Sequence, residues 1–198
     1  MEILQDLEDI SSSVWAELTK AHHQKRHPWR TPAMGNVAGN ELGLRTIVLR
    51  KSDTASRKIR FYTDNRSAKW PAVERGVGFA VLFWNPKKSW QLQMHGSTLI
   101  VDQEQTHHIW ASLPVHSRSS YATKLAPGSP LPGPDNGLAD HFFDMSLEET
   151  AYAEAHFAVF DIVVDLFESL QLSRNGHRRA KFKWEENSQN WDGQWIVP

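Results

Sequence analysis

The chain has 198 residues, of which 40% are hydrophobic, and this length suits one domain that buries a substantial core. It has no cysteine, which excludes disulfides, thiolate metal sites and cysteine nucleophiles. The formal net charge of −1 gives no overall basic field for nucleic acid or an anionic membrane, so we expect neither as a partner.

The N-terminal residues predict an amphipathic helix over about residues 2–26. Apolar side chains recur at helical spacing from Ile3 to Leu18, and the prolines of HPWRTP then end the helix. The acidic start MEILQDLEDI lacks the basic and then apolar pattern of a signal peptide, and no run is long enough to span a bilayer. A cytoplasmic location is therefore the expectation.

Strand patterns follow, up to about residue 100. A strand from Met34 leads through the turn GNVAGN to the strand LRTIVLR, and KIRFYT then places Ile59 and Phe61 on one face. DNRSAKWPAVERG suits a short helix with Ser67 as its N-cap and Gly76 as its stop. VGFAVLFW is an almost continuous apolar run, which predicts a strand buried on both faces.

The second half continues this alternation of strands and helices. NPKKS forms a hairpin before WQLQMHGSTLIV, in which Trp90, Leu92 and Met94 share one face. DQEQTHHIWASL and SRSSYATKL suit helices, and a Pro/Gly-rich loop occupies about residues 126–140. SLEE is a capping box that opens a helix towards His156, and FAVFDIVVDLFESLQL, HRRAKFKWEE and NWDGQWIVP are the last strands. The sum predicts one α+β domain over residues 1–198, a mostly antiparallel β-barrel with flanking helices.

Several side-chain groups allow both a chemical and a structural interpretation. His23 and His27 have ligand-like spacing, but no carboxylate falls in register, so solvent-facing histidines are favoured and no metal site is expected. Asp161 and Asp165 suit an acid/base pair, although charges at strand edges are more common. The nine tryptophans fit a well-filled core and subunit contacts better than a flat-ring ligand. The glycine-rich nucleotide motifs and the H-E-x-x-H and G-x-S-x-G motifs are absent from the sequence.

Cations crowd the ends of RTIVLRKSDTASRKIRFYTDNRSAK, residues 45–69. Arg45 and Lys69 bracket two strands and a helix start, where Ser67 would add a hydroxyl and exposed backbone N–H groups. Several such donors converging on one point bind phosphate. On spacing alone, solvated strand ends remain the slightly better interpretation.

The order of the motifs changes that balance. RTIVLR, FYTDNRSAK, WQLQMHG and the C-terminal HRRAKF together resemble the pyridoxamine 5′-phosphate oxidase-like family of FMN-binding split barrels. The resemblance covers about residues 29–198 and is greater to the broad oxidase-related group than to the biosynthetic enzyme. It implies a homodimer that holds FMN at the subunit interface.

The resemblance also implies roles for individual residues, although it assigns no catalytic residue. The residues that would contact FMN, with Gln91 reaching it from the partner subunit, are Arg45, Thr46, Ile47, Val48, Arg50, Tyr62, Thr63, Ser67, Lys69, Gln91 and Lys181. Those that would meet the substrate are Arg50, Ser117, His177 and Arg179.

This chain departs from the family pattern within the phosphate-binding motif. Ala68 stands where the oxidase has arginine, and Arg66 is near enough in sequence to substitute for it. The oxidase has lysine at the position of Arg50 and arginine at that of Lys181, and Leu172 falls near its flavin-contacting tryptophan.

Other departures fall on the substrate side. Ile109 and Leu113 occupy the positions of the tyrosine and arginine that bind the substrate phosphate, and neither can bind a dianion. Arg118 and Tyr121 are local alternatives, and His177-x-Arg179 reverses the order of the oxidase's R-x-H pair.

Two functions from different classes follow from these observations. The first is an FMN-dependent oxidoreductase that acts on a small substrate, and the second is a non-catalytic flavin-binding carrier or sensor. A third interpretation is an interaction domain whose cofactor site has decayed, for which Ala68 is the main support.

Overall fold

The computed structural model describes residues 4–38 and 41–198. Its strands are β1 (Ala33–Ala38), β2 (Glu41–Thr46), β3 (Lys51–Asp53), β4 (Lys58–Asp64), β5 (Phe79–Asn85), β6 (Trp90–Ile100), β7 (Phe157–Gln171), β8 (Arg178–Glu185) and β9 (Asn190–Ile196). Its helices are α1 (Leu7–His23), α2 (Trp70–Glu74), α3 (Gln103–Ala111) and α4 (Val115–Arg118), with the 3₁₀ turns η1 (Pro28–Arg30), η2 (Ser119–Tyr121), η3 (Phe142–Asp144) and η4 (Ala151–His156).

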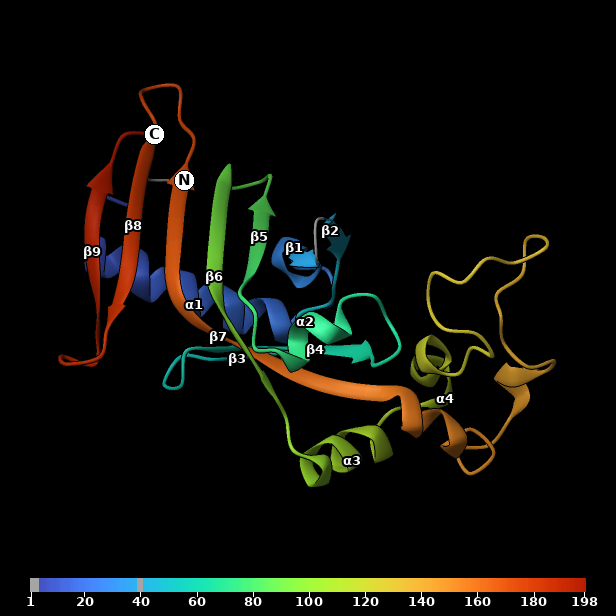
Figure 1. Ribbon diagram of the computed structural model, residues 1–198. Coiled ribbons are helices and arrows are strands. Elements are labelled where there is room, and N and C mark those ends of the chain that lie inside the picture. Colours follow the sequence, from blue (N-terminus) through green and yellow to red (C-terminus); the bar gives the residue numbers. More distant parts are fainter. Residues whose placement is uncertain (1–3, 39–40) are drawn as a thin grey trace.

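Within these residues the nine strands form one antiparallel sheet in the order β2-β1-β5-β6-β7-β4-β3, with β8 and β9 continuing from β7. The central strand is β7, drawn as a long curved strand in Figure 1. Its first half pairs with β4, its second half pairs with β8, and β6 pairs along its other edge from Phe160 to Gln171. The β6 register shifts at Gly96, where a Cβ would collide with the Val163 carbonyl, so only glycine fits this bulge.

The two ends of the sheet, β2 and β3, are consecutive in the chain and are joined by residues 47–50. The N–H groups of Ile47 and Leu49 donate to the carbonyls of Pro32 and Arg30, at 3.0 and 2.9 Å, whereas Arg50 N–H donates to Arg60 on β4, at 2.9 Å. The joining segment therefore contacts the residues that lead into β1 and strand β4, without closing a ladder between β2 and β3. The expected α+β split-barrel fold with flanking helices is confirmed, and the sheet is not closed.

Two clusters of buried apolar side chains meet along β4 and β7. The larger fills the barrel beneath α1 and includes Trp29, Trp90 and Phe61, all less than 3% exposed. The smaller cluster is formed by side chains of residues 101–159 and includes Trp110 and Tyr121. Much of the tryptophan excess thus fills the core, as expected.

Helix α1 covers one end of the barrel and is fixed there by a buried carboxylate. Asp6 caps its N-terminus by accepting hydrogen bonds from the N–H groups of Glu8 and Asp9, at 2.8 and 3.2 Å. Glu17 is 4% exposed and pairs with Lys20 at 2.8 Å and with Lys88 of the β5–β6 turn at 2.7 Å. Burial raises the Glu17 pKa, but the two ammonium groups outweigh it and hold this pKa at about 2.

Strand β5 corrects one expectation from the sequence. Phe79, Val81 and Phe83 are buried, but the alternate side chains are not: Leu82 is 39% and Trp84 is 42% exposed. The prediction that β5 is buried on both faces is wrong for the single chain. An apolar run in the sequence does not reveal whether the same chain covers the second face of the strand. The outer face of the sheet therefore carries uncovered apolar side chains.

The short helix α2 corrects another expectation. It begins at Trp70, and Lys69 takes the N-cap position without a capping side-chain hydrogen bond, so Ser67 is not the cap. The predicted stop is confirmed, since Gly76 has a φ of +66° and follows the last turn. Residues 39 and 40, in the turn expected between β1 and β2, lie outside the described residues.

Residues 101–156 contain short helices and loops but no strand, and they lie on one side of the sheet (Figure 1). The helix expected at SRSSYATKL is limited to α4 and η2, and residues 122–141 contain neither helix nor strand. The capping box forms, with Ser146 N–H donating to Glu149 Oε2 at 2.7 Å, but the 3₁₀ turn η4 follows it. No helix in the described part of the chain has the length and hydropathy needed to cross a membrane.

Candidate functional site

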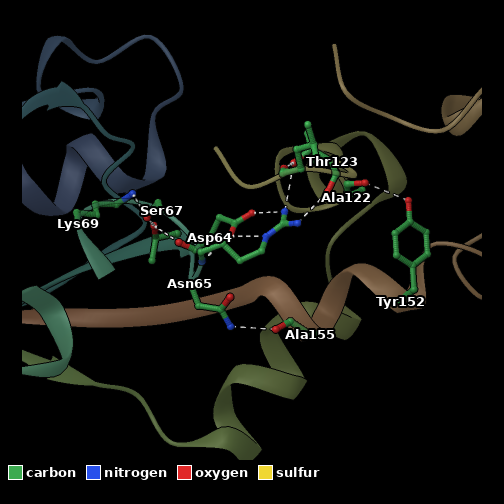
Figure 2. Close-up of polar contacts among 11 residues, drawn as sticks. Asp64, Asn65, Ser67, Lys69, Ala122, Thr123, Tyr152 and Ala155 are labelled. Atoms are coloured by element: carbon green, nitrogen blue, oxygen red, sulfur yellow. Dashed lines mark hydrogen bonds and ion pairs between the residues drawn. The ribbon is translucent and has the colours of Figure 1, made fainter. Parts of the chain in front are cut away.

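The predicted phosphate-binding side chains meet where β4 leads into α2. Thr63 and Ser67 are both buried, and their hydroxyl oxygens lie 3.4 Å apart. Lys69 Nζ donates to Ser67 Oγ at 3.0 Å, as Figure 2 shows. Arg45, at the end of β2, is close enough to Lys69 for their charges to interact. We call Arg45, Thr63, Ser67 and Lys69 the cationic corner.

The cationic corner has excess positive charge in a partly buried place. Burial lowers the pKa of Lys69 to about 8, with the charge of Arg45 as the second cause, and burial also lowers the pKa of Arg45. Asp64 opposes the shift of Lys69, but its carboxylate already accepts from Arg66, at 2.7 Å. A desolvated pair of cations with two adjacent hydroxyls is suited to an anion such as a phosphate.

Asn36 on β1 belongs to the same place and was not predicted from the sequence. Its Oδ1 accepts a hydrogen bond from Arg45, while its Nδ2 is buried without a partner among the described residues. A buried donor without a partner costs about 1–3 kcal/mol, so an added acceptor here would stabilise the protein. In the sequence Asn36 lies in GNVAGN, where it was interpreted as a turn residue.

Residues 46–50 present alternate side chains to the core. Ile47 and Leu49 point into the barrel, whereas Thr46 is exposed and Val48 and Arg50 are half-buried on the other face. Among the described residues, the N–H of Val48 donates to no other group. Because the side chain of Ile47 points into the barrel, Ile47 could contact a ligand on the opposite face only through its backbone.

Arg50 lies at the boundary between the two apolar clusters. Its guanidinium carbon is 4.9 Å from the centre of the Tyr62 ring, and its Nε is buried without a hydrogen bond in the described part of the chain. Burial raises the pKa of Tyr121 to about 12, although the nearby charge of Arg50 opposes this shift. Burial likewise raises the pKa of Tyr62, so both phenols stay neutral at physiological pH.

Gln91 lies away from the cationic corner. On β6 it pairs in register with Trp84 and Leu170, on the outer face of the sheet, and β5 and β1 separate β6 from β2. The structure does not bring Gln91 to Arg45 within one chain.

The C-terminal candidates form a second group on β8. Arg179 and Lys181 both face Glu168, at 2.6 and 3.7 Å, and His177 Nδ1 accepts from Ser173 N–H at 3.1 Å. Arg179 pairs with residue 170 of β7, while Thr63 pairs with residue 158, which is on the order of 40 Å away along the strand. One chain therefore divides the predicted site into the cationic corner and this β8 group.

The residues nearest Ser117 serve packing. Ser117 is half-buried in α4, and Ile109 and Leu113 pack against the smaller apolar cluster. Arg118 is 4% exposed and donates to the carbonyls of Leu113, Leu147 and Trp110. The prediction that Arg118 substitutes for the missing substrate-binding side chains is thus wrong, because its guanidinium is engaged by backbone carbonyls.

Arg66 does not replace the arginine that is absent at position 68. Its guanidinium forms two hydrogen bonds with Asp64, at 2.7 and 3.1 Å, and reaches the carbonyl and hydroxyl oxygens of Thr123, at 2.9 and 3.2 Å. Figure 2 shows Asp64 and Thr123 on either side of this contact. Arg66 connects the segment between β4 and α2 to the start of the Pro/Gly-rich loop, and Ala68 is exposed beside it.

The remaining chemical candidates are engaged in structural contacts. Asp161 accepts two hydrogen bonds from Arg60, at 2.7 and 2.9 Å, so it does not pair with Asp165. His27 is half-buried against Glu17 at 3.3 Å and does not face solvent as expected. In residues 4–38 and 41–198, no group of three or more His, Asp or Glu side chains is arranged to hold a metal ion.

Comparison with known proteins identifies related domains and structures. Residues 12–102 match the model of the pyridoxamine 5′-phosphate oxidase FMN-binding domain, and this segment contains the cationic corner, Arg50 and Gln91. The resemblance and the FMN cofactor expected from the sequence are thereby confirmed. A search of curated proteins found no match.

Three solved structures share the fold. A pyridoxamine 5′-phosphate oxidase-related, FMN-binding protein of Nostoc punctiforme PCC 73102 is 20% identical, with a TM-score of 0.73 over 100% of both chains. PhzG of Burkholderia lata 383, solved in complex with tetrahydrophenazine-1-carboxylic acid, is 15% identical, with a TM-score of 0.73 over 100% of this chain and 98% of that one. A Clostridium acetobutylicum protein related to general stress protein 26 of B. subtilis is 10% identical, with a TM-score of 0.57 over 92% of this chain and 99% of that one.

Proposed function

Because residues 12–102 match the FMN-binding domain of the pyridoxamine 5′-phosphate oxidase family, we propose that this chain is an FMN-dependent oxidoreductase acting on a small molecule as a homodimer. The observation that carries the proposal is the cationic corner, where two partly buried cations and two hydroxyls lie together with no free counter-charge among the described residues. When bound, FMN supplies the transfer of a hydride or of two electrons.

The donors of the cationic corner suit the phosphate of FMN. Arg45 and Lys69 supply the charge for a dianion, and Ser67 and Thr63 supply hydroxyl donors. The unpartnered Nδ2 of Asn36 adds a further donor. The N–H of Val48 and the side chain of Arg50 offer hydrogen-bond donors for the polar edge of the flavin ring system of FMN.

A second copy of the chain would unite the two halves of the site. The outer face of β2, β1 and β5 carries Leu42 and Leu44, which are 74% and 73% exposed, next to Val37, Leu82 and Trp84. A contiguous apolar face of this kind marks an association surface. Pairing through it would let Gln91 and the β8 group, with Lys181, His177 and Arg179, meet the cationic corner of the partner. Since both apolar clusters pack against β7, we treat residues 1–198 as one domain in this dimer.

The test of the cofactor site is the double variant Arg45→Ala/Lys69→Ala. Each side chain would make charge-assisted hydrogen bonds worth about 1.5–3 kcal/mol, so FMN should bind about 10²–10⁴-fold more weakly. Flavin absorbance per protein measures this, with Arg75→Ala/Lys87→Ala, at two exposed positions, as the matched control. Unchanged flavin content in the double variant would contradict the assignment.

Turnover separates the enzyme from a flavin carrier or sensor. The FMN-loaded protein should bleach under anaerobic conditions with NAD(P)H or a candidate amine and recover its colour in air. A yellow protein that no reductant bleaches would favour the carrier. A protein that does not bind added FMN would remove both functions.

A further inference from the structure

Asn36 is a buried polar side chain on β1 that holds Arg45 in place. It is 3% exposed and lies on the same face of the strand as Met34, which belongs to the larger apolar cluster. Its Oδ1 accepts a hydrogen bond from Arg45 Nη1. Because a guanidinium only donates hydrogen bonds, this contact fixes the orientation of the amide. Among the described residues, the Nδ2 of Asn36 is then left buried without a partner.

Gly43 on β2 makes room for this contact. In the antiparallel register Asn36 lies opposite Gly43, and Arg45 lies opposite Met34. The side chain of Arg45 therefore runs back over Gly43 to reach Asn36. A Cβ at position 43 would collide with Nη2 of Arg45, so a residue with a side chain there would displace the guanidinium. Asn36 and Gly43 together set the position of this guanidinium.

The contact of Arg45 with Asn36 adds no negative charge, unlike the contacts of three other arginines of the sheet. Arg60, Arg66 and Arg179 each pair with a carboxylate, at 2.7, 2.7 and 2.6 Å, which balances their charge. In the described part of the chain no carboxylate pairs with Arg45, so the amide holds the guanidinium and leaves its charge uncompensated. Arg45 and Lys69 thus keep two positive charges for a ligand of the cationic corner.

The amide at position 36 has two informative replacements. An aspartate would accept the same hydrogen bond from Arg45, but it would cancel one of the two positive charges and replace the Nδ2 donor with an acceptor. A leucine of similar size would lose the hydrogen bond without adding charge. Comparing the two separates the effect of charge from that of the hydrogen bond.

We propose that Asn36 is a positioning residue that fixes Arg45 without neutralising it, and that this uncharged contact gives the site its selectivity for FMN over riboflavin, which lacks the phosphate. The inference rests on the proposed function, because it assigns the selectivity of that same cofactor site. Arg45 supplies the charge, and Asn36 acts through it.

The experiment measures the affinities of FMN and riboflavin for the full chain, freed of flavin by dialysis, by the quenching of flavin fluorescence. Asn36→Asp should weaken FMN about 10²-fold and leave riboflavin unchanged, because the new carboxylate neutralises Arg45 and repels the phosphate. Asn36→Leu should weaken FMN only about fivefold, since it removes a hydrogen bond and adds no charge. The ratio of the two affinities isolates the phosphate, because the flavins differ in nothing else.

Gly43→Ala tests the position of the guanidinium directly. The added Cβ should displace Arg45, so the preference for FMN over riboflavin should fall about tenfold, although residue 36 and the charge of the site are unaltered. A native preference in Gly43→Ala would show that the position of Arg45 does not matter, which contradicts the proposal.

Asn85→Asp is the matched control for the added charge. Asn85 is also 3% exposed, and its Oδ1 accepts from the N–H groups of Lys87 and Lys88, at 3.1 and 3.2 Å, as a carboxylate would. This variant should bind both flavins as the native chain does.

A native preference for FMN in Asn36→Asp would overturn the proposal. Equal weakening of FMN and riboflavin would mean a general structural effect and would overturn it as well. If the native chain binds neither flavin, the proposed function fails, and inorganic phosphate then tests the inference on the same protein. Phosphate should raise the unfolding temperature of the native chain but not that of Asn36→Asp, and an equal rise, or none in either protein, would refute the role of Asn36.

Discussion

At the scale of single residues, Lys69 has the most strongly shifted pKa in the cationic corner. It lies beside Arg45 and Ser67, and burial, followed by the charge of Arg45, lowers its pKa from 10.5 to about 8. In the unfolded chain the pKa returns to its ordinary value. Between these two pKa values the folded protein binds fewer protons than the unfolded one, so its stability rises with pH in that window.

We therefore predict that the FMN-free protein gains stability between about pH 8 and 10.5, relative to the variant Lys69→Met. Below pH 8 the charged lysine carries the full cost of its burial beside Arg45, and above pH 10.5 this cost of roughly 3 kcal/mol has disappeared. Unfolding midpoints measured across this range for both proteins provide the check.

Lys87→Met, at an exposed position, is the control and should track the native chain. Parallel stability curves for the native chain and Lys69→Met would show that Lys69 is not desolvated.

The sequence predicted residue types better than it predicted the direction of long side chains. Thr63, Ser67 and Lys69 meet because β4 and the turn after it fix their backbone. Arg66 and Arg118 were expected near ligands, but they bind Asp64 with Thr123 and a set of backbone carbonyls instead. Long flexible side chains take the partners that tertiary packing brings near, and local sequence does not contain that information.

At the scale of elements, the contact between Arg66 and Thr123 joins the β4–α2 connection to the Pro/Gly-rich loop. That loop has few other backbone bonds, among them Lys124 N–H to the Gly137 carbonyl at 2.7 Å. It also borders a cavity of about 260 Å³ lined by uncharged residues, including Ser120, Thr123 and Leu125. The contact of Arg66 with Thr123 thus helps to hold the start of the loop against the β4–α2 connection.

Arg66→Ala should loosen this loop without unfolding the barrel. Losing the two contacts to Thr123 removes about 1–3 kcal/mol of local stability, so trypsin should cleave after Lys124 roughly tenfold faster. Limited proteolysis followed by mass spectrometry measures the rate at this bond.

Arg75→Ala, an exposed arginine beyond α2, should leave cleavage after Lys124 at the native rate. If Arg66→Ala also left it unchanged, other contacts would have to hold the loop.

Strand β5 shows where element prediction from sequence fails. Its type and position were predicted, because an apolar run between turn residues is typical of a strand. Its exposure was not, because Leu82 and Trp84 have the composition of a buried face while this chain leaves them uncovered. A strand that is buried only in an assembly has the same apolar composition as a strand that is buried within one chain.

At the scale of the whole molecule, the uncovered outer face predicts how two copies associate. Leu44 on β2 and Leu82 on β5 lie on this face and are 73% and 39% exposed. The variant Leu44→Glu/Leu82→Glu should shift the protein from dimer to monomer, because two desolvated carboxylates would oppose burial of the face. Sedimentation velocity gives the oligomeric state, and flavin content should fall in parallel.

The control is Leu131→Glu, which changes an equally apolar and 43% exposed residue in the Pro/Gly-rich loop. It should remain dimeric. A double variant that still sedimented as a dimer would place the interface elsewhere.

The split-barrel fold was predictable from the ordered motifs, whereas the division of the site between β2–β4 and β8 was not. Arg45 and Lys181 lie on different parts of the sheet, and no periodicity in the sequence indicates which chain supplies each to a common ligand. Only the register of β7 with β4 and β8 reveals how far apart they are.

The central position of β7 also determines when the protein can acquire its cofactor during synthesis. β4 and β6 both pair with β7, yet β7 begins only at Phe157, long after these partners have left the ribosome. Until then Tyr62 and Thr63, which pair with Val159 and Ala158, lack the strand that fixes their backbone, so the nascent chain has no assembled place for FMN. Such distant pairing is slow to form and exposes apolar strands in the meantime. Flavin loading is thus expected only after β7 has been synthesised.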